Sequence, residues 1–231
     1  MAGRSVCQSI FYISERGLFM ETRYTKIYTL GTEAALKITP GHFATNHAHT
    51  NYYLDVTTLK ARTSEAQQIA KALAGMYLYD TVVDTIVCME GTEVIGAYLS
   101  DELTKSGFMN TNLHKTIYVV SPEFNSNSQI IFRDNLQIAI RGKNVIVLMA
   151  TVTTGHSANK AIESVLYYGG KLQGVSAIFS SIDHLEGVPI RAVFGVKDLP
   201  DYASYDYRNC PLCKAGKKID ALVNAFGHSK L

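Results

Sequence analysis

Hydrophobic positions along the middle of the chain follow two patterns that alternate. Runs of consecutive apolar residues are typical of strands covered on both faces, and they span residues 82–89, 115–120, 144–148, 175–179 and 190–194. Between several of these runs, apolar residues recur three and four positions apart, which is typical of amphipathic helices near residues 64–74 and 158–168. Strands that alternate with helices through short links predict right-handed crossovers and a parallel sheet, so the expected fold class is α/β.

The flanking regions carry weaker signals. Short β-like runs precede the alternation at residues 9–13, 26–30, 34–39 and 52–56. We expect the third run to stop at Pro40-Gly41, which is a turn dipeptide. The polar stretch 121–135 predicts a mobile loop or a hairpin. These signals divide the chain into a small N-terminal hood, a core and a C-terminal tail, at residues 1–62, 63–205 and 206–231.

Composition narrows the classes of function. Of the 231 residues, 47% are hydrophobic and 18% charged, so the chain can bury a core. The net charge of +2, without runs of like charge, does not indicate a nucleic-acid partner. We find no apolar stretch of about 18 residues, the length a membrane span needs. The N-terminus lacks the apolar region of a signal peptide, so we expect a cytoplasmic protein without membrane contact.

The four cysteines fall into different settings. Cys88 lies in an apolar run and is expected to be a buried small hydrophobe. Cys210 and Cys213 form a single Cys-x-x-Cys, which supplies half of a structural zinc site. Cys7 and His228 could complete such a site. We favour a plain structural or dimer-contact role for the pair and assign no metal site.

The most informative segment follows the strand at 144–148. Small and hydroxylated residues there lead into a helix, and Gly155 lets the backbone turn tightly. Amides at a helix N-terminus lack intrahelical partners and attract anions. The candidate phosphate-binding residues are Thr151, Thr153, Thr154, Gly155, His156, Ser157 and Ala158. The alternative is that Ser157 simply caps the helix, that the threonines satisfy a turn, and that His156 is merely tolerated.

The segment Val145–Ala158 resembles the phosphoribosyl pyrophosphate (PRPP) motif of the type I phosphoribosyltransferases. That motif has four apolar residues, two acidic residues, two further residues and then Thr-Thr-Gly with a small pair. Other segments resemble orotate phosphoribosyltransferases more loosely, and the likeness covers roughly residues 34–218. They are similar to the substrate segment, the pyrophosphate-loop strand and helix, and a C-terminal tail, at residues 42–56, 82–99 and 207–218.

The resemblance implies a Rossmann-like parallel sheet flanked by helices under a small hood. It also implies PRPP with Mg²⁺ as donor, a base or orotate as acceptor, and a homodimer. On this basis the ribose and pyrophosphate region comprises Met149, Ala150, Glu90, Gly91 and Thr92, and the acceptor pocket comprises Asn46, His47 and Tyr53. His42, His47 and His49 cluster in the hood segment, where lining the acceptor pocket is favoured over a metal trio.

The chain departs from the family where chemistry is expected. Met149 and Ala150 occupy the two acidic positions that hold the ribose hydroxyls in the family. Ser121-Pro122-Glu123 stands where orotate-type enzymes place an Arg-Lys pair, and Asn46 stands where a lysine is common. Four acids could compensate for the missing pair by binding ribose or metal: Glu90, Glu93, Asp134 and Asp183. Lone acids are, however, more often solvated or capping residues.

Two functions therefore stay open. The first is an enzyme similar to orotate phosphoribosyltransferase, which binds PRPP or a nucleotide 5′-phosphate and transfers phosphoribose to a pyrimidine or related base. The second is a catalytically impaired regulatory protein that binds a nucleotide or PRPP. The two functions differ in whether the chain transfers phosphoribose. The missing acidic pair bears on that step, and the fold alone does not decide it, because a fold does not fix an activity.

Overall fold

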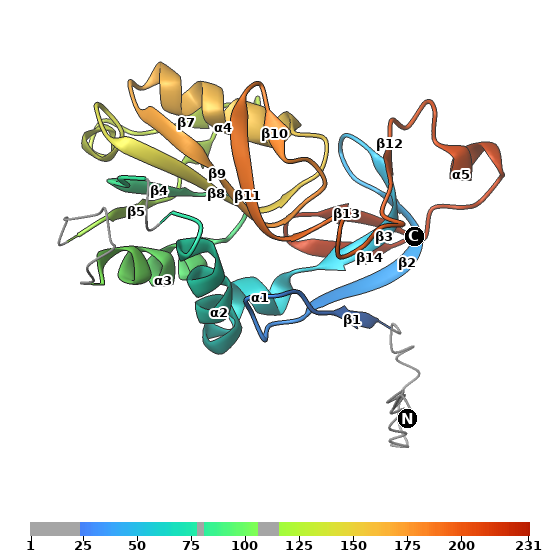
Figure 1. Cartoon of the computed structure of the whole chain (residues 1–231). Helices are drawn as coiled ribbons and strands as arrows, with labels where there is room; N and C mark the ends of the chain where they lie inside the picture. The colour runs from blue at the N-terminus through green and yellow to red at the C-terminus, as the bar shows by residue number, and fades with distance from the viewer. Residues whose placement is uncertain (1–23, 78–80, 106–115) are drawn as a thin grey trace, which may run out of the picture.

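The computed structural model describes residues 24–77, 81–105 and 116–231. Its central sheet has six strands in the order β10-β11-β9-β8-β4-β5, and all of them are parallel except β10 (Figure 1). The strands are β4 (Thr85–Cys88), β5 (Tyr118–Val120), β8 (Asn144–Val152), β9 (Lys171–Ser180), β10 (His184–Leu185) and β11 (Val188–Gly195). The predicted parallel α/β sheet is confirmed.

Helices cover both faces of this sheet because β4, β8 and β9 are apolar on both sides. Ile146 and Leu148 pack into one core with α2 (Thr63–Ala74) and α3 (Glu93–Thr104). Their neighbours Val145 and Val147 face the opposite way, into a second core with α4 (His156–Tyr167). Figure 1 shows α4 on one side of the sheet and α2 and α3 on the other.

A second sheet, the hood sheet, lies beside the core (Figure 1). Its order is β12-β3-β2-β13-β14, with β1 on β2, and β13 runs parallel to β2 whereas the other pairs are antiparallel. The strands are β1 (Thr25–Ile27), β2 (Leu36–Ala44), β3 (His49–Asp55), β12 (Ser204–Tyr205), β13 (Ala221–Asn224) and β14 (Gly227–Lys230). The hood sheet therefore combines segments from the beginning and the end of the described chain.

Short elements connect these layers. They are α1 (Thr57–Ala61), the antiparallel pair β6 (Glu123–Phe124) and β7 (Ile130–Ile131), the 3₁₀ turn η1 (Gln137–Ala139) and α5 (Pro211–Lys214). The β6–β7 pair confirms the hairpin alternative for residues 121–135. None of the helices in the described part of the chain is long and apolar enough to cross a membrane.

The predicted stop at Pro40-Gly41 is wrong. Strand β2 continues through this dipeptide to Ala44, and its register with β3 shifts between Pro40 and Phe43. A β-bulge accommodates a proline that cannot donate to the ladder. Gly41 is needed there because an added Cβ would lie 2.6 Å from the ring of Phe43. The strand predicted at residues 9–13 lies outside the described residues.

Candidate functional site

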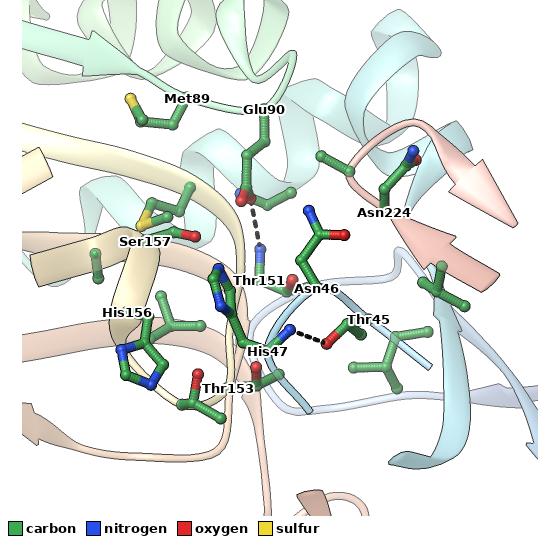
Figure 2. A pocket seen from close by; sticks show the side chains of 18 of the residues that line it. Thr45, Asn46, His47, Met89, Glu90, Thr151, Thr153, His156, Ser157 and Asn224 are labelled. Atoms are coloured by element: carbon green, nitrogen blue, oxygen red, sulfur yellow. Dashed lines mark hydrogen bonds between the residues drawn. The ribbon is translucent and has the colours of Figure 1, made fainter. Parts of the chain in front are cut away.

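A cavity of about 580 Å³ opens between the core and the hood sheet. Most of its walls come from five places: the end of β8 with the start of α4, the loop after β4, the β6–β7 hairpin, the β2–β3 turn with β3, and the β13–β14 turn. Figure 2 shows Glu90, Asn46 and His47, from the loop after β4 and from the β2–β3 turn, around a common space. Ligands of open parallel sheets bind at the carboxyl ends of the strands, and the ends of β4 and β8 meet here.

The first turn of α4 forms one wall of this cavity. The helix begins after Gly155, and no side chain caps it. The turn carries no acidic residue, and Thr154, His156 and Ser157 are exposed. Ser157 lies inside the helix, so the alternative that it caps α4 is wrong. The free amides and the helix dipole favour an anion at this point.

Gly155 is required by the geometry of the loop. Its φ of 81° is left-handed, a region that glycine enters without cost. An added Cβ would lie 2.8 Å from Cδ1 of Leu185, on the neighbouring strand β10. The backbone therefore turns sharply and packs closely at the point where β8 gives way to α4.

Basic groups surround the loop. The rings of His47 and His156 are 5.2 Å apart, and Lys160 also lines the cavity. Burial lowers the pKa of His47, and the nearby His156 and Lys160 lower it further. Sequence reasoning missed Lys160, although its place one helical turn after His156 was a usable signal. An anion bound at the loop would relieve the repulsion among these groups.

Glu90 brings a carboxylate to the position next to Met149 and Ala150. Glu90 lies in the turn after β4. Its φ of 60° is left-handed, which is unusual for a residue other than glycine. Its Oε2 accepts hydrogen bonds from the amides of Ala150 (3.1 Å) and Thr151 (3.4 Å) (Figure 2). Burial raises the pKa of Glu90, while these two amides and Lys60 act in the opposite direction.

Glu90 is the sole acid among the cavity-lining residues in the described part of the chain. The other three compensating candidates do not line the cavity. Glu93 accepts a hydrogen bond from Ser121 Oγ (2.7 Å), and Asp134 accepts one from Gln137 Nε2 (3.0 Å). The backbone carbonyl of Asp183 accepts from the amide of Ile190 (2.8 Å).

Lys60 connects the core to the β13–β14 turn. Its Nζ donates to the carbonyl oxygens of Glu90 and Ala225, each at 2.7 Å. Burial lowers the pKa of Lys60, and the nearby Glu90, Glu93 and Asp55 oppose this shift. No local pattern around Lys60 indicates this role, because both acceptors are backbone atoms distant in the chain.

The remaining predicted residues divide into two groups. Met149, Ala150, Asn46, His47 and Tyr53 line the cavity. Gly91 and Thr92 do not line it. The Thr92 hydroxyl instead donates to the carbonyls of Met89 (2.8 Å) and Leu148 (3.1 Å), so it holds the β4 loop against β8.

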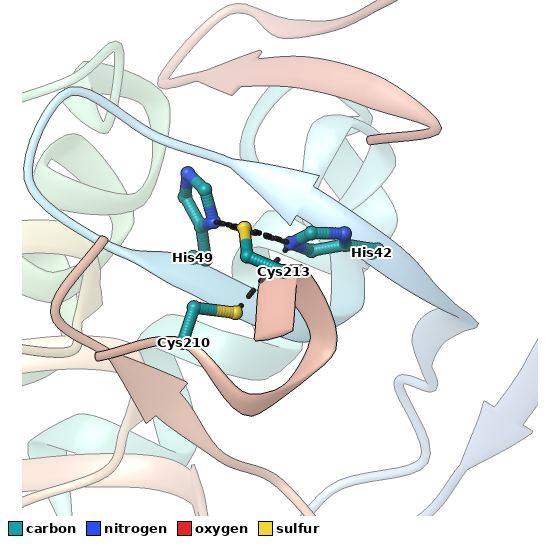
Figure 3. Close-up of side chains that lie close together, drawn as sticks. All are labelled: His42, His49, Cys210 and Cys213. Atoms are coloured by element: carbon teal, nitrogen blue, oxygen red, sulfur yellow. Dashed lines mark hydrogen bonds between the residues drawn. The ribbon is translucent and has the colours of Figure 1, made fainter. Parts of the chain in front are cut away.

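The three hood histidines are separated by the fold. His47 lines the cavity, whereas His42 and His49 lie with Cys210 and Cys213 (Figure 3). Lining the acceptor pocket was therefore the wrong interpretation for His42 and His49. His228, the suggested partner of the cysteine pair, packs against the ring of Tyr53 at 4.7 Å instead. The other suggested partner, Cys7, lies outside the described residues.

Comparison with known proteins supports the same class of fold. No family model matches the chain. The solved structure of Leishmania donovani UMP synthase superposes with a TM-score of 0.53 at 18% identity, over 70% of this chain and 34% of that one. At this identity the likeness concerns the fold alone. It agrees with the predicted α/β fold class, a parallel sheet flanked by helices.

The chain is also similar in sequence to curated proteins. The orotate phosphoribosyltransferase of Caldanaerobacter subterraneus is 35% identical over 78 residues, which cover 33% of this chain and 39% of that protein. The orotate phosphoribosyltransferase of Thermus thermophilus is 27% identical over 183 residues, which cover 78% of this chain and 91% of that protein. The curated relatives that the chain resembles are thus orotate phosphoribosyltransferases.

Proposed function

We propose that this chain binds the 5′-phosphate of PRPP or of a nucleoside monophosphate at the α4 loop and transfers phosphoribose to a pyrimidine or related base. The observation that carries the proposal is the uncapped N-terminus of α4, which opens into the cavity of about 580 Å³. A cavity of this size suits a small ligand. The orotate phosphoribosyltransferases among the relatives support the choice of substrate class.

The phosphate is held by backbone amides and by side-chain donors together. The amides of the first turn point at the anion, and the hydroxyls of Thr153, Thr154 and Ser157 donate to its oxygens. His156 and Lys160 add positive charge beside them. The helix dipole alone contributes about 0.3–1 kcal/mol, so the hydrogen bonds provide most of the affinity.

Glu90 takes over part of the role of the missing acidic pair. Its carboxylate lies against Ala150 and Thr151, beside the positions where the family's acids hold the ribose hydroxyls. Mg²⁺ binds through one or two carboxylates together with substrate phosphates, and Glu90 fits as that carboxylate. When bound with PRPP, Mg²⁺ would neutralise charge on the pyrophosphate.

In the transfer step a nitrogen of the base attacks the anomeric carbon, the bond from that carbon to the pyrophosphate oxygen breaks, and pyrophosphate leaves with the electron pair. A proton carried by that nitrogen is released to solvent. Asn46, His47 and Tyr53 line the part of the cavity that belongs to the hood, where they would orient the base. The bound ligand and the hood exclude water from the reacting carbon.

A second candidate is a binding protein without transfer activity, and two observations favour it. Positive charge stabilises a departing pyrophosphate, yet Arg133 is ion-paired with Glu123 at 2.7 Å on the surface of the β6–β7 hairpin. Met149 and Ala150 also leave the ribose with fewer acids than the family provides. Binding and transfer therefore need separate measurements.

Calorimetry with PRPP, uridine monophosphate and inorganic phosphate tests binding. Thr154→Val combined with Ser157→Ala should weaken all three about 10-fold or more, because two hydroxyl donors are lost. Ser100→Ala, on α3 outside the cavity, serves as a matched control. Absence of heat and of a thermal shift with every ligand would refute the proposal.

A second assay uses labelled PRPP with orotate and the purine and pyrimidine bases to test transfer. Formation of a nucleotide supports the enzyme. Binding of PRPP without any nucleotide formed supports the second candidate. We also propose a homodimer, as the resemblance implies, and separately a cytoplasmic location. Light scattering on the purified chain tests the oligomeric state.

A further inference from the structure

Four potential metal ligands meet on the hood sheet, away from the cavity. His42 lies in β2, His49 begins β3, and Cys210 and Cys213 flank the start of α5 (Figure 3). One ligand atom from each residue lies within 4.8 Å of those of the other three. Figure 3 shows the two thiols and the two rings directed toward one point. None of the four residues lines the cavity.

The distances match a tetrahedral zinc site. Zinc bonds of about 2.0 Å to nitrogen and 2.3 Å to sulfur place ligand atoms roughly 3.3–3.8 Å apart. Nε2 of His42 lies 3.6 Å from Sγ of Cys210 and 3.7 Å from Sγ of Cys213. Nδ1 of His49 lies 3.3 Å from Sγ of Cys213 and 3.1 Å from Nε2 of His42. Small adjustments would let all four atoms surround one ion.

Hydrogen bonding prepares His42 as a ligand. Its Nδ1 lies 2.8 Å from the carbonyl oxygen of Lys217, which can only accept, so Nδ1 carries the proton. In the neutral ring, the lone pair of Nε2 therefore points at the two thiols and His49. Metal-binding histidines commonly donate their other ring N–H to a backbone carbonyl in this way.

The backbone holds this region in register. The amide of His42 donates to Asp220 Oδ2, and the amide of Asp220 donates to the carbonyl oxygen of His42, each at 2.7 Å. The positive φ of Gly216 (72°) allows the chain to turn sharply after Cys213. The ligands from the two ends of the chain are thus fixed relative to each other.

The types of donor atom in the four side chains indicate which metal ion they would bind. Two thiolates and two neutral imidazoles form a donor set that suits Zn²⁺. Both cysteines are free thiols rather than a disulfide. Thiols are weak hydrogen-bond donors, so they gain little from facing two imidazoles without an ion. Four protein ligands fill the tetrahedral shell, which is typical of a structural and not a catalytic site.

We propose that His42, His49, Cys210 and Cys213 bind one structural Zn²⁺ that fastens the C-terminal segment to the hood sheet. The segment after Cys213 leads to β13, which pairs with β2 next to His42. The β13–β14 turn then lines the cavity through Asn224, Ala225, Phe226 and Gly227. The ion therefore stabilises the hood side of the cavity without contacting its ligand.

Metal analysis of the full-length chain, purified without chelator, tests this site. We expect about one zinc per chain, because four protein ligands close one site. The double variant Cys210→Ser/Cys213→Ser should lose the zinc, and His49→Ala should weaken it at least 10-fold in a competition assay with a chromogenic chelator. Cys88→Ala and His184→Ala, outside the cluster, are controls that should keep full occupancy.

Cobalt substitution keeps the test independent of how well the variants fold. The wild-type chain is stripped with chelator and titrated with Co²⁺, which should produce thiolate-to-cobalt charge-transfer bands and visible bands of tetrahedral geometry. Zinc should abolish the bands. Absence of zinc from the purified wild-type chain together with absence of these bands would overturn the proposal. A Cys210–Cys213 disulfide found by mass spectrometry in the freshly purified chain would also overturn it.

Discussion

The carboxylate of Glu90, in the turn after β4, accepts a hydrogen bond of 3.1 Å from the amide of Ala150 on the adjacent strand β8. Ala150 occupies one of the two positions where the resemblance implies an acid. The chain thus places a carboxylate beside that position from the turn after a neighbouring strand.

Glu90 should make the free energy of unfolding depend on pH. Burial raises its pKa in the folded state above the unfolded value of about 4.3. Its contribution is therefore fully present below the unfolded pKa and is lost as pH rises through the raised folded pKa. Urea unfolding from about pH 4 to pH 8 should show Glu90→Gln gaining stability relative to wild type as pH rises. A constant difference across this range would contradict the prediction.

An acid at position 150 should raise the affinity for PRPP only when Glu90 is replaced by the neutral residue Gln. In Ala150→Asp, the new carboxylate would meet that of Glu90, and like charges disfavour each other. We expect no gain in PRPP affinity from Ala150→Asp alone. Combined with Glu90→Gln, it should bind PRPP about 10-fold more tightly than Glu90→Gln alone, because one charge-assisted hydrogen bond is regained. Calorimetry with PRPP compares the wild type, the two single variants and the double variant. An equal gain in PRPP affinity from Ala150→Asp with Glu90 and with Gln at position 90 would argue against a contact between the two side chains.

Gly155→Ala should weaken both the fold and phosphate binding. The left-handed φ of 81° costs a residue with a Cβ about 1–2 kcal/mol, and the new methyl group would press on Leu185. Displacement of the loop moves the amides that face the anion. Gly142→Ala is the matched control, because its φ is 73° but nothing lies near an added Cβ. It should lose similar stability in urea and keep the phosphate affinity of the wild type.

Lys60→Met should loosen the β13–β14 turn. The variant removes the two hydrogen bonds that Nζ of Lys60 donates to the carbonyls of Glu90 and Ala225. Both carbonyls lose this donor and face the apolar side chain of Met instead. We expect about 1–3 kcal/mol less stability and faster amide exchange in residues 222–228. Lys71→Met, on the exposed face of α2, is the control and should change neither. Unchanged exchange in the turn would show that Lys60 does not hold it.

Local patterns explain why the core could be predicted. The strand at 144–148 and the helix after Gly155 follow from apolar runs and helical spacing, which involve only neighbours in the chain. The phosphate loop is local as well, because a helix N-terminus exposes its own amides. Its role as a binding site stays a prediction until a ligand is measured.

Contacts between residues far apart in the chain became visible in the folded protein alone. The parallel α/β core, and a glycine turn that leads from a buried strand into a helix, could be inferred from the sequence, because these features arise from periodicity and backbone geometry within short segments. Only the folded chain could pair β13 with β2, bring Glu90 to Ala150, and turn His42 and His49 away from the cavity toward Cys210 and Cys213. Such contacts depend on how whole strands and helices pack, so the spacing of residues within one segment does not predict them.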